Sequence, residues 1–273
     1  MLKLSSTALC ATIQRMYQLQ NKSIVITGAA SGIGHALAHA CAQRGARLLL
    51  ADIDTTGLQA LAQELSTAPA GAVHTCVTDT GDEAAIAALA ERAQELFGAA
   101  DVLVNNAGVA LVSPLDAVGT ADAQWLMNIN FWGVAHGCRA FAAQLRTRPE
   151  ACVVNISSIF AMVSMPTQGM YNASKAAVRA YSDSLREELR STSVRVLCVH
   201  PGGIATQIAN RARVVDASLI AKDAAAMRQQ FDHAARTTPA QAAQAIVRAM
   251  EQRKTRLLIG GDAVLLDAIF RLF

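Results

Sequence analysis

Tyr171 and Lys175 are the residues of this sequence whose types and spacing point most directly to chemistry. They are four positions apart, so in a helix they would lie on one face, one turn from each other. A free tyrosine has a pKa near ~10, and a nearby ammonium lowers that pKa by favouring the phenolate. The pair is therefore suited to move a proton to or from an alcohol or carbonyl oxygen. The same spacing occurs on ordinary surface helices, so it indicates a site only together with a cofactor and a polar partner.

The helix that must carry this pair is predicted at residues 174–190, where apolar side chains recur at helical spacing without glycine or proline. Short apolar runs predict strands at 23–27, 47–51, 72–77, 102–104, 151–156, 194–199 and 257–259. The other predicted helices end near residue 44 or cover 58–65, 82–97, 122–145 and 239–250. This alternation indicates an α/β fold: a doubly wound parallel sheet of Rossmann type, with about seven strands and helices on both faces.

Polar and glycine-rich clusters follow the predicted strands, at residues 28–34, 52, 105–108, 157–158 and 201–203. In a parallel sheet all strands end at the same edge, and ligands of open α/β sheets bind outside that carboxyl edge. The sequence therefore predicts one ligand site built from these clusters.

The first cluster holds Gly28, Gly32 and Gly34 between a predicted strand and a predicted helix. Without Cβ atoms, these residues allow a tight turn and the close approach of a pyrophosphate to the helix N-terminus. Their spacing differs from the general G-x-G-x-x-G dinucleotide pattern. Asp52 ends the second strand 18 residues after Gly34, close to the ~20 expected for an acid that binds ribose hydroxyls. The alternative for Asp52 is a cap on the next turn.

Several motifs occur in one order: Thr27-Gly28-x-x-x-Gly32-x-Gly34, Asn105-Asn106-Ala107-Gly108, Ser158, Tyr171-x-x-x-Lys175 and Pro201-Gly202. With them, the chain resembles the short-chain dehydrogenase/reductase family over residues 20–260. The resemblance implies an oxidoreductase that transfers hydride between a nicotinamide cofactor and a secondary alcohol or ketone. A protein of this fold that binds nucleotide without turnover is the alternative, and the complete set of motifs argues against it.

The resemblance implies four catalytic residues: Asn130, Ser158, Tyr171 and Lys175. Tyr171 would be the general acid/base, and Lys175 would lower its pKa and bind the nicotinamide ribose. Ser158 would hold the substrate oxygen, with Ser157 as the alternative. Asn130 would anchor a water in the proton relay; Asn128 is its neighbouring alternative, but the glycine at 133 favours Asn130.

The resemblance also implies the cofactor-binding residues: Gly28, Ser31, Gly32, Ile33, Gly34, Asp52, Val77, Asn105, Ala107, Gly108, Tyr171, Lys175, Pro201, Gly202, Ile204 and Thr206. A carboxylate at Asp52 favours NAD(H) over NADP(H), because a 2′-phosphate would meet a like charge and neither Ser31 nor Ile53 is basic. The third strand ends in Cys76-Val77 where the family usually has Asp-Val. Asp79 is the candidate to replace the missing acid.

The residues expected to contact substrate are Ser158, Phe160, Met165 and Tyr171. Met162 and Met170 would extend Phe160 and Met165 into an adaptable apolar wall, which predicts a substrate of apolar character; core packing is the alternative. Arg211 and Arg213 would either meet an acidic substrate or lie in solvent.

Composition limits the other possibilities. A hydrophobic content of 52% with 16% charged residues suits a large core, and a net charge of +3 without a basic block does not indicate nucleic-acid binding. No apolar run reaches the ~18 residues of a membrane span, and the six cysteines have no paired spacing, which indicates a cytoplasmic protein with reduced thiols. His35 and His39 are four apart, but no third ligand is evident, so we expect a surface pair and no metal site.

The domain boundaries follow from the same patterns. We expect a single catalytic domain at 21–262, a short N-terminal arm at 1–20, a helix-like segment at 205–236 that shapes the substrate pocket, and an apolar tail at 263–273. The resemblance implies a homodimer or homotetramer acting on a small molecule.

Overall fold

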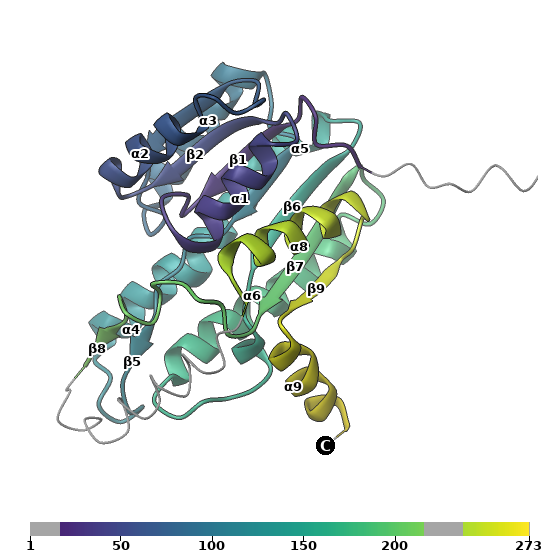
Figure 1. Ribbon diagram of the computed structural model, residues 1–273. Helices are drawn as coiled ribbons and strands as arrows, with labels where there is room; N and C mark the ends of the chain where they lie inside the picture. The colour runs from purple at the N-terminus through teal and green to yellow at the C-terminus, as the bar shows by residue number, and fades with distance from the viewer. Residues whose placement is uncertain (1–16, 216–236, 273) are drawn as a thin grey trace, which may run out of the picture.

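A computed structural model describes residues 17–215 and 237–272 of the chain (Figure 1). Seven strands form one parallel sheet in the order β3-β2-β1-β4-β6-β7-β9. The strands are β1 (Ser23–Thr27), β2 (Arg47–Asp52), β3 (Val73–Val77), β4 (Val102–Asn105), β6 (Ala151–Ile156), β7 (Val194–Pro201) and β9 (Arg256–Ile259). The predicted doubly wound α/β fold is confirmed.

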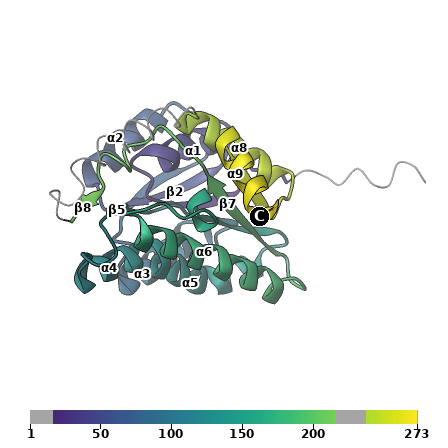
Figure 2. The ribbon, with the colours of Figure 1, turned by 90° about the horizontal axis from the view of Figure 1, so that it is seen from below.

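Helices cover both faces of the sheet (Figure 2). One layer contains α1 (Gly32–Ala42), α2 (Thr55–Leu65) and α8 (Pro239–Glu251), and the other contains α3 (Glu83–Phe97), α5 (Gly133–Thr147) and α6 (Gly169–Glu188). Alternate strand residues supply the two cores: Ile24 and Ile26 face the α1 layer, whereas Val25 between them faces the α3 layer. This alternation explains why the strands are continuous apolar runs.

The strand order reverses between β1 and β4, which are paired neighbours although β2 and β3 lie between them in the sequence. Ligands of open α/β sheets bind at such a reversal. The loop after β1 contains Gly28 and the loop after β4 contains Ala107. A Cβ on Gly28 would lie 2.7 Å from the Cα of Ala107, so the two loops are in direct contact there.

The predicted helix at 122–145 is not one regular helix. It consists of α4 (Thr120–Met127), a π-helical turn (Asn128–Trp132) and α5. A π-turn inserts an extra residue into the helix and often occurs at functional sites. Here its middle residue is Asn130, which is fully buried. The apolar periodicity of the sequence shows no sign of this insertion.

The predicted N-terminal arm and the predicted helix-like segment also differ from the structure. Tyr17 and Leu19, which we assigned to the arm, are buried in the core against α8 and the sheet. The segment predicted to be helix-like contains strand β8 (Arg213–Val214), which pairs with β5 (Leu111–Val112) as a separate two-stranded sheet. The remainder of the predicted helix-like segment, from residue 216 to 236, lies outside the described residues.

The predicted apolar tail forms most of helix α9 (Gly261–Leu272). No helix in the described ranges has the length and apolar content needed to cross a membrane. The five cysteines within those ranges are all unpaired.

Candidate active site

Tyr171 and Lys175 both belong to α6, which begins at Gly169 and not at the predicted residue 174. The tyrosine is therefore in the first turn of the helix, and the lysine is one turn further on. Lys175 is only 3% exposed, and its Nζ donates a hydrogen bond to the carbonyl oxygen of Ile156 at 3.1 Å. Its Nζ lies 5.9 Å from the centre of the Tyr171 ring. The end of β6 and the start of α6 thus fix the pair at the carboxyl edge of the sheet.

Ser158 lies beside this tyrosine, in the turn after β6. Its Oγ accepts a hydrogen bond from the backbone N–H of Phe160 at 3.1 Å, which fixes the hydroxyl at the start of a short 3₁₀ turn. The alternative, Ser157, donates its hydroxyl to the backbone carbonyl of Lys175 at 2.8 Å and is buried. The geometry therefore places Ser158 next to Tyr171 and gives Ser157 a bracing role between β6 and α6.

Burial raises the pKa of the Tyr171 phenol, and a hydrogen bond with Ser158 acts in the opposite direction. Burial also lowers the pKa of Lys175 from 10.5 to about 8. The sequence predicted that Lys175 would set a low pKa for Tyr171, and this expectation requires correction. The same burial disfavours the charged form of both groups, so the phenol stays protonated at neutral pH.

His200, near the end of β7, contacts the backbone of Ser158. Its Nδ1 lies 3.3 Å from the backbone carbonyl oxygen of Ser158. Since a carbonyl only accepts, Nδ1 carries the proton. Burial lowers the pKa of His200 to about 4, so the ring is neutral at physiological pH. No motif in the sequence indicates the contact between His200 and Ser158.

Asn130 connects the loop after β4 to α6. Its Oδ1 accepts a hydrogen bond from the N–H of Val109 at 2.8 Å, and its Nδ2 donates to the Val109 carbonyl at 2.9 Å and to Ser174 Oγ at 3.1 Å. A Cβ on Gly108 would lie 3.3 Å from both Asn130 Oδ1 and Lys175 Nζ. The geometry thus makes Asn130 a positioning residue. Its predicted alternative, Asn128, has its Cβ towards Gly81 instead.

The glycine turn after β1 has the backbone that its spacing predicts. Gly28 and Gly32 have positive φ angles of 63° and 56°, a region that residues with a Cβ rarely adopt. Gly34 has ordinary helical geometry, but a Cβ there would lie 2.1 Å from the carbonyl oxygen of Gly28. The Cγ2 of Thr206 would lie 3.3 Å from a Cβ on Gly32. Thr206 therefore lies directly against the glycine turn.

The N-terminus of α1 is open to an anion. Its N-cap, Ser31, makes no side-chain capping hydrogen bond, and the first turn contains no acidic residue. The free backbone N–H groups and the helix dipole both favour a phosphate there. Of the other predicted cofactor residues, Ile33 follows in this turn, whereas Pro201 ends β7 and Ile204 lies in the loop after it.

Asp52 points back to the glycine turn. Its Oδ2 accepts a hydrogen bond from the N–H of Ala30 at 2.9 Å, and its Oδ1 accepts one from the N–H of Asp54 at 3.0 Å. The cap of α2 is Asp54, whose side chain accepts a hydrogen bond from the N–H of Gly57. Asp52 therefore caps the turn that follows β2, as its alternative role predicted, while the cap of helix α2 is Asp54.

Two asparagines, Asn105 at the end of β4 and Asn106 directly after it, connect the segments around the site. Asn106 donates to the carbonyl oxygens of Thr27 and Gly28, which joins the two cofactor loops. Asn105 is buried and donates to Asn155 Oδ1 at 2.9 Å, and Asn155 in turn donates to Ser182 Oγ on α6 at 3.0 Å. The side chain of Asn105 thus faces the core. Sequence reasoning missed Asn155 because it lies inside an apolar strand without a motif.

Asp262 is a second residue that the sequence did not reveal. Its carboxylate accepts a hydrogen bond from the N–H of Gly203 at 2.6 Å, and it lies where a Cβ of Gly202 would be. The first turn of α9 thereby holds the loop after β7 in place. The two positions are some 60 residues apart in the sequence, and no spacing pattern connects them.

The third strand has the predicted departure. Val77 ends β3 with its side chain 58% exposed, and the Asp79 carboxylate accepts a hydrogen bond from the N–H of Gly81. The Asp79 carboxylate is thus hydrogen-bonded within its own turn. That Asp79 replaces the missing acid near the adenine stays a prediction.

The predicted apolar wall divides into two groups. Phe160 packs edge-to-face on the Tyr171 ring, with centroids 6.4 Å apart, and Met165 and Met170 are half-buried. Met162 is buried in a small core with Ile159 and Ala263, under α9. The expectation of a substrate wall is therefore wrong for Met162, and the alternative of core packing is confirmed for this residue, which packs against Ala263 of α9.

The two arginines of the next loop also differ from each other. Arg213 pairs with Asp122 at 2.6 Å and stacks on the Trp125 ring at 3.7 Å, which fixes β8 to α4. Arg211 is exposed. Arg213 is thus bound to its own chain, and not free in solvent as we expected.

Comparisons with known proteins agree with this geometry. The fold and the Ser–Tyr–Lys arrangement define a dinucleotide-binding oxidoreductase class, and the family model described as short chain dehydrogenase matches residues 22–216. The chain belongs to the short-chain dehydrogenase/reductase family. SadH of Mycobacterium tuberculosis, provisionally named an oxidoreductase, is 35% identical over 260 residues, covering 94% of this chain and 92% of its own.

The fold of this chain is also similar to solved structures of short-chain dehydrogenases. A short-chain dehydrogenase/reductase from Burkholderia phymatum, in complex with NAD, is 32% identical with a TM-score of 0.84 over 94% of each chain. A short-chain dehydrogenase from Streptomyces avermitilis is 30% identical with a TM-score of 0.81, covering 92% of this chain and 94% of its own.

Proposed function

We propose that the protein is an NAD(H)-dependent oxidoreductase that interconverts a secondary alcohol and a ketone of apolar character, with Tyr171 as general acid/base. The observation that carries the proposal is the convergence of Ser158, Tyr171 and Lys175 at the carboxyl edge of the sheet, next to the glycine turn. Family membership supports the reaction class, and the site supports the assignment of roles.

The residues present fit a dinucleotide. Gly28 and Gly34 leave no room for a Cβ atom, and the uncapped start of α1 suits the pyrophosphate. Asp52 would bind the adenosine ribose, and Val77, Ala107 and the loop with Thr206 would line the rest of the cofactor. When bound, the nicotinamide supplies the hydride donor in one direction and the acceptor in the other.

The chain's own residues handle the proton. In reduction, the protonated Tyr171 donates to the carbonyl oxygen while Ser158 holds that oxygen by a hydrogen bond. In oxidation, the phenolate form of Tyr171 accepts the proton of the alcohol. The raised pKa of the phenol suits the donor role at neutral pH. Lys175, held by the Ile156 carbonyl, would bind the nicotinamide ribose and supply positive charge when the phenolate forms.

The preference for NAD(H) rests on the direction of the Asp52 carboxylate. One oxygen accepts a hydrogen bond from the N–H of Ala30 in the glycine turn and the other from the N–H of Asp54, and each keeps a lone pair for a ribose hydroxyl. A 2′-phosphate would meet this charge. The next residue, Ile53, is 67% exposed and carries no compensating charge.

The substrate class rests on the side chains around Tyr171. The Phe160 ring packs against the tyrosine, and Met165 and Met170 lie in the following segment. Methionine adapts to irregular apolar shapes, so we expect a neutral ketone or alcohol with an apolar substituent.

A cytoplasmic location and a homodimeric or homotetrameric assembly stay predictions.

The decisive experiment compares Tyr171→Phe with Tyr181→Phe, a matched removal of a hydroxyl on the same helix. A panel of apolar secondary alcohols with NAD, monitored by nicotinamide absorbance, identifies a substrate first. Tyr171→Phe should bind NADH like the wild type but lose at least about 10³-fold in kcat, at the upper range of a general acid/base contribution. Tyr181→Phe should retain turnover. Activity of Tyr171→Phe within tenfold of the wild type would refute the assigned role.

A further inference from the structure

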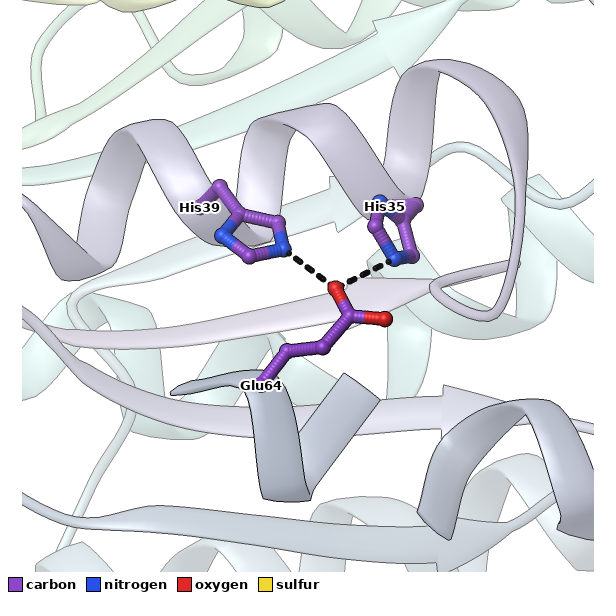
Figure 3. Close-up of side chains that lie close together, drawn as sticks. All are labelled: His35, His39 and Glu64. Atoms are coloured by element: carbon purple, nitrogen blue, oxygen red, sulfur yellow. Dashed lines mark hydrogen bonds and ion pairs between the residues drawn. The ribbon is translucent and has the colours of Figure 1, made fainter. Parts of the chain in front are cut away.

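His35, His39 and Glu64 meet on the face of the molecule formed by α1 and α2 (Figure 3). His35 and His39 are one turn apart on α1, and Glu64 extends from the last turn of α2. The Nε2 atoms of His35 and His39 lie 3.1 Å and 2.9 Å from the same oxygen, Oε2 of Glu64. The sequence suggested the histidine pair but no third ligand, and the packing of α2 on α1 supplies it.

From this geometry we infer a binding site for a divalent transition metal of the zinc class, in which His35, His39 and Glu64 supply three ligands. The three ligand atoms all lie within 4.8 Å of one another. In a tetrahedral zinc site with bonds near 2.0–2.2 Å, ligand atoms are about 3.4 Å apart. The two nitrogen–oxygen separations are therefore slightly short of those required, and small rotations of half-exposed side chains accommodate the ion.

The chemistry of the three groups selects the class of metal. Two imidazoles and one carboxylate suit zinc, cobalt, nickel or copper, whereas magnesium and calcium prefer oxygen ligands. Neutral imidazole can carry its proton on Nδ1, which leaves the Nε2 lone pair for the metal.

The supporting elements fix the ligands in place. On α1, Leu37 and Ala38 are fully buried between the two histidines, and on α2 the residue after Glu64, Leu65, is buried. The histidine side chains are 33% and 34% exposed and that of Glu64 is 48% exposed. The site is thus preorganised on two anchored helices and open to solvent, with the fourth position free for a water.

The location suggests what the metal does. Helix α1 starts at the glycine turn, and α2 starts just after Asp52, so the two helices flank the adenosine half of the proposed cofactor site. The first turn of α2 also lies against the glycine turn that precedes α1, where a Cβ on Gly57 would lie 2.8 Å from the Cβ of Ala30. A metal bound between His39 and Glu64 would join the two helices and stabilise this half of the fold.

The test uses the full chain without an affinity tag, treated with chelator and then titrated with zinc by calorimetry at neutral pH. Cobalt is the spectroscopic probe, because four-coordinate cobalt has visible absorption bands. Wild-type protein should bind a single equivalent of each metal, and magnesium should not compete. His39→Gln and Glu64→Gln should each weaken binding by at least about 100-fold, the upper range for loss of a mere supporting residue.

The matched control is His136→Gln. His136 also faces a glutamate, Glu83, at 3.6 Å, but no second histidine within residues 17–215 and 237–272 joins them. This variant should bind zinc like the wild type. A thermal readout separates site occupancy from catalysis: at one hundred times the dissociation constant, zinc should raise the wild-type melting temperature by about 5 °C and leave Glu64→Gln unchanged.

Three results would each overturn the inference: no saturable zinc binding by the wild type, equal binding by Glu64→Gln, or loss of binding in His136→Gln. Both test substitutions are at half-exposed positions and preserve side-chain size approximately, so the variants should fold. Circular dichroism without metal checks this. None of these measurements depends on turnover, so failure of the metal site and failure of the proposed reaction are distinguishable.

Discussion

Replacing Lys175 by methionine should remove activity and yet make the protein more stable. The lysine is 3% exposed, and burial lowers its pKa from 10.5 to about 8. Each pKa unit corresponds to about 1.4 kcal/mol, so keeping the ammonium in the folded protein costs about 3 kcal/mol at neutral pH. Methionine removes this cost but loses the hydrogen bond to the Ile156 carbonyl, about 1 kcal/mol. The net gain should be about 2 kcal/mol.

The gain should depend on pH in a defined direction. Below pH 8 the lysine is charged in both the folded and the unfolded state, so the full burial cost destabilises the wild type. Between pH 8 and 10.5 the folded protein releases the proton while the unfolded chain retains it. The wild type therefore gains stability relative to the variant as pH rises through this window. Above pH 10.5 both states are neutral and the cost is absent.

The assay is urea unfolding of both proteins at pH 7 and near pH 10, with equal slopes as the check on two-state behaviour. Tyr171→Phe serves as the control, because it removes activity without removing a buried charge and should show no comparable pH-dependent gain. If Lys175→Met is less stable than the wild type at pH 7, or if the difference between them is the same at both pH values, the account of a costly buried ammonium is refuted.

The remaining predictions concern the cofactor. Wild-type enzyme should prefer NAD(H) over NADP(H) by at least about tenfold in kcat/KM, which one charged hydrogen bond at Asp52 can supply. The double variant Asp52→Ala with Ile53→Arg should narrow or invert this ratio. Equal use of both cofactors by the wild type would show that the carboxylate does not bind the ribose. Gly34→Ala places a Cβ 2.1 Å from the Gly28 carbonyl oxygen and should abolish NADH binding measured by fluorescence. The same substitution at Gly98, where a Cβ meets nothing within 4 Å but φ is 74°, should lower stability and leave NADH binding intact.

Local sequence was sufficient for the sheet and for most of the site. Central strands such as β1 and β6 were predicted because they are fully buried apolar runs, without the polar alternation of a strand that is exposed on one face. The edge strand β3 is only partly buried and has a weaker pattern. The glycine turn, Asp52, Ser158 and the Tyr171–Lys175 pair were found because each depends on short-range spacing. A glycine next to a close backbone contact, or two side chains one helical turn apart, is already specified by neighbouring residues.

Contacts between distant segments required the tertiary structure. Sequence favoured Ser158 over Ser157, but it could not show that the Ser157 hydroxyl is engaged by the backbone carbonyl of Lys175 on α6. Nor could it show that Asp262 holds the loop at Gly203, or that a π-turn places Asn130 in the core.

Glu64 shows the physical reason most clearly. Its sequence neighbours specify an exposed glutamate near the end of an amphipathic helix, and only the packing of α2 against α1 brings its carboxylate to His35 and His39. The pKa of Tyr171 belongs to the same class, since burial and Ser158 determine its direction and the lysine four residues away does not. Spacing within a segment fixes which groups can meet; desolvation and packing between segments decide which of them do and in which charge state.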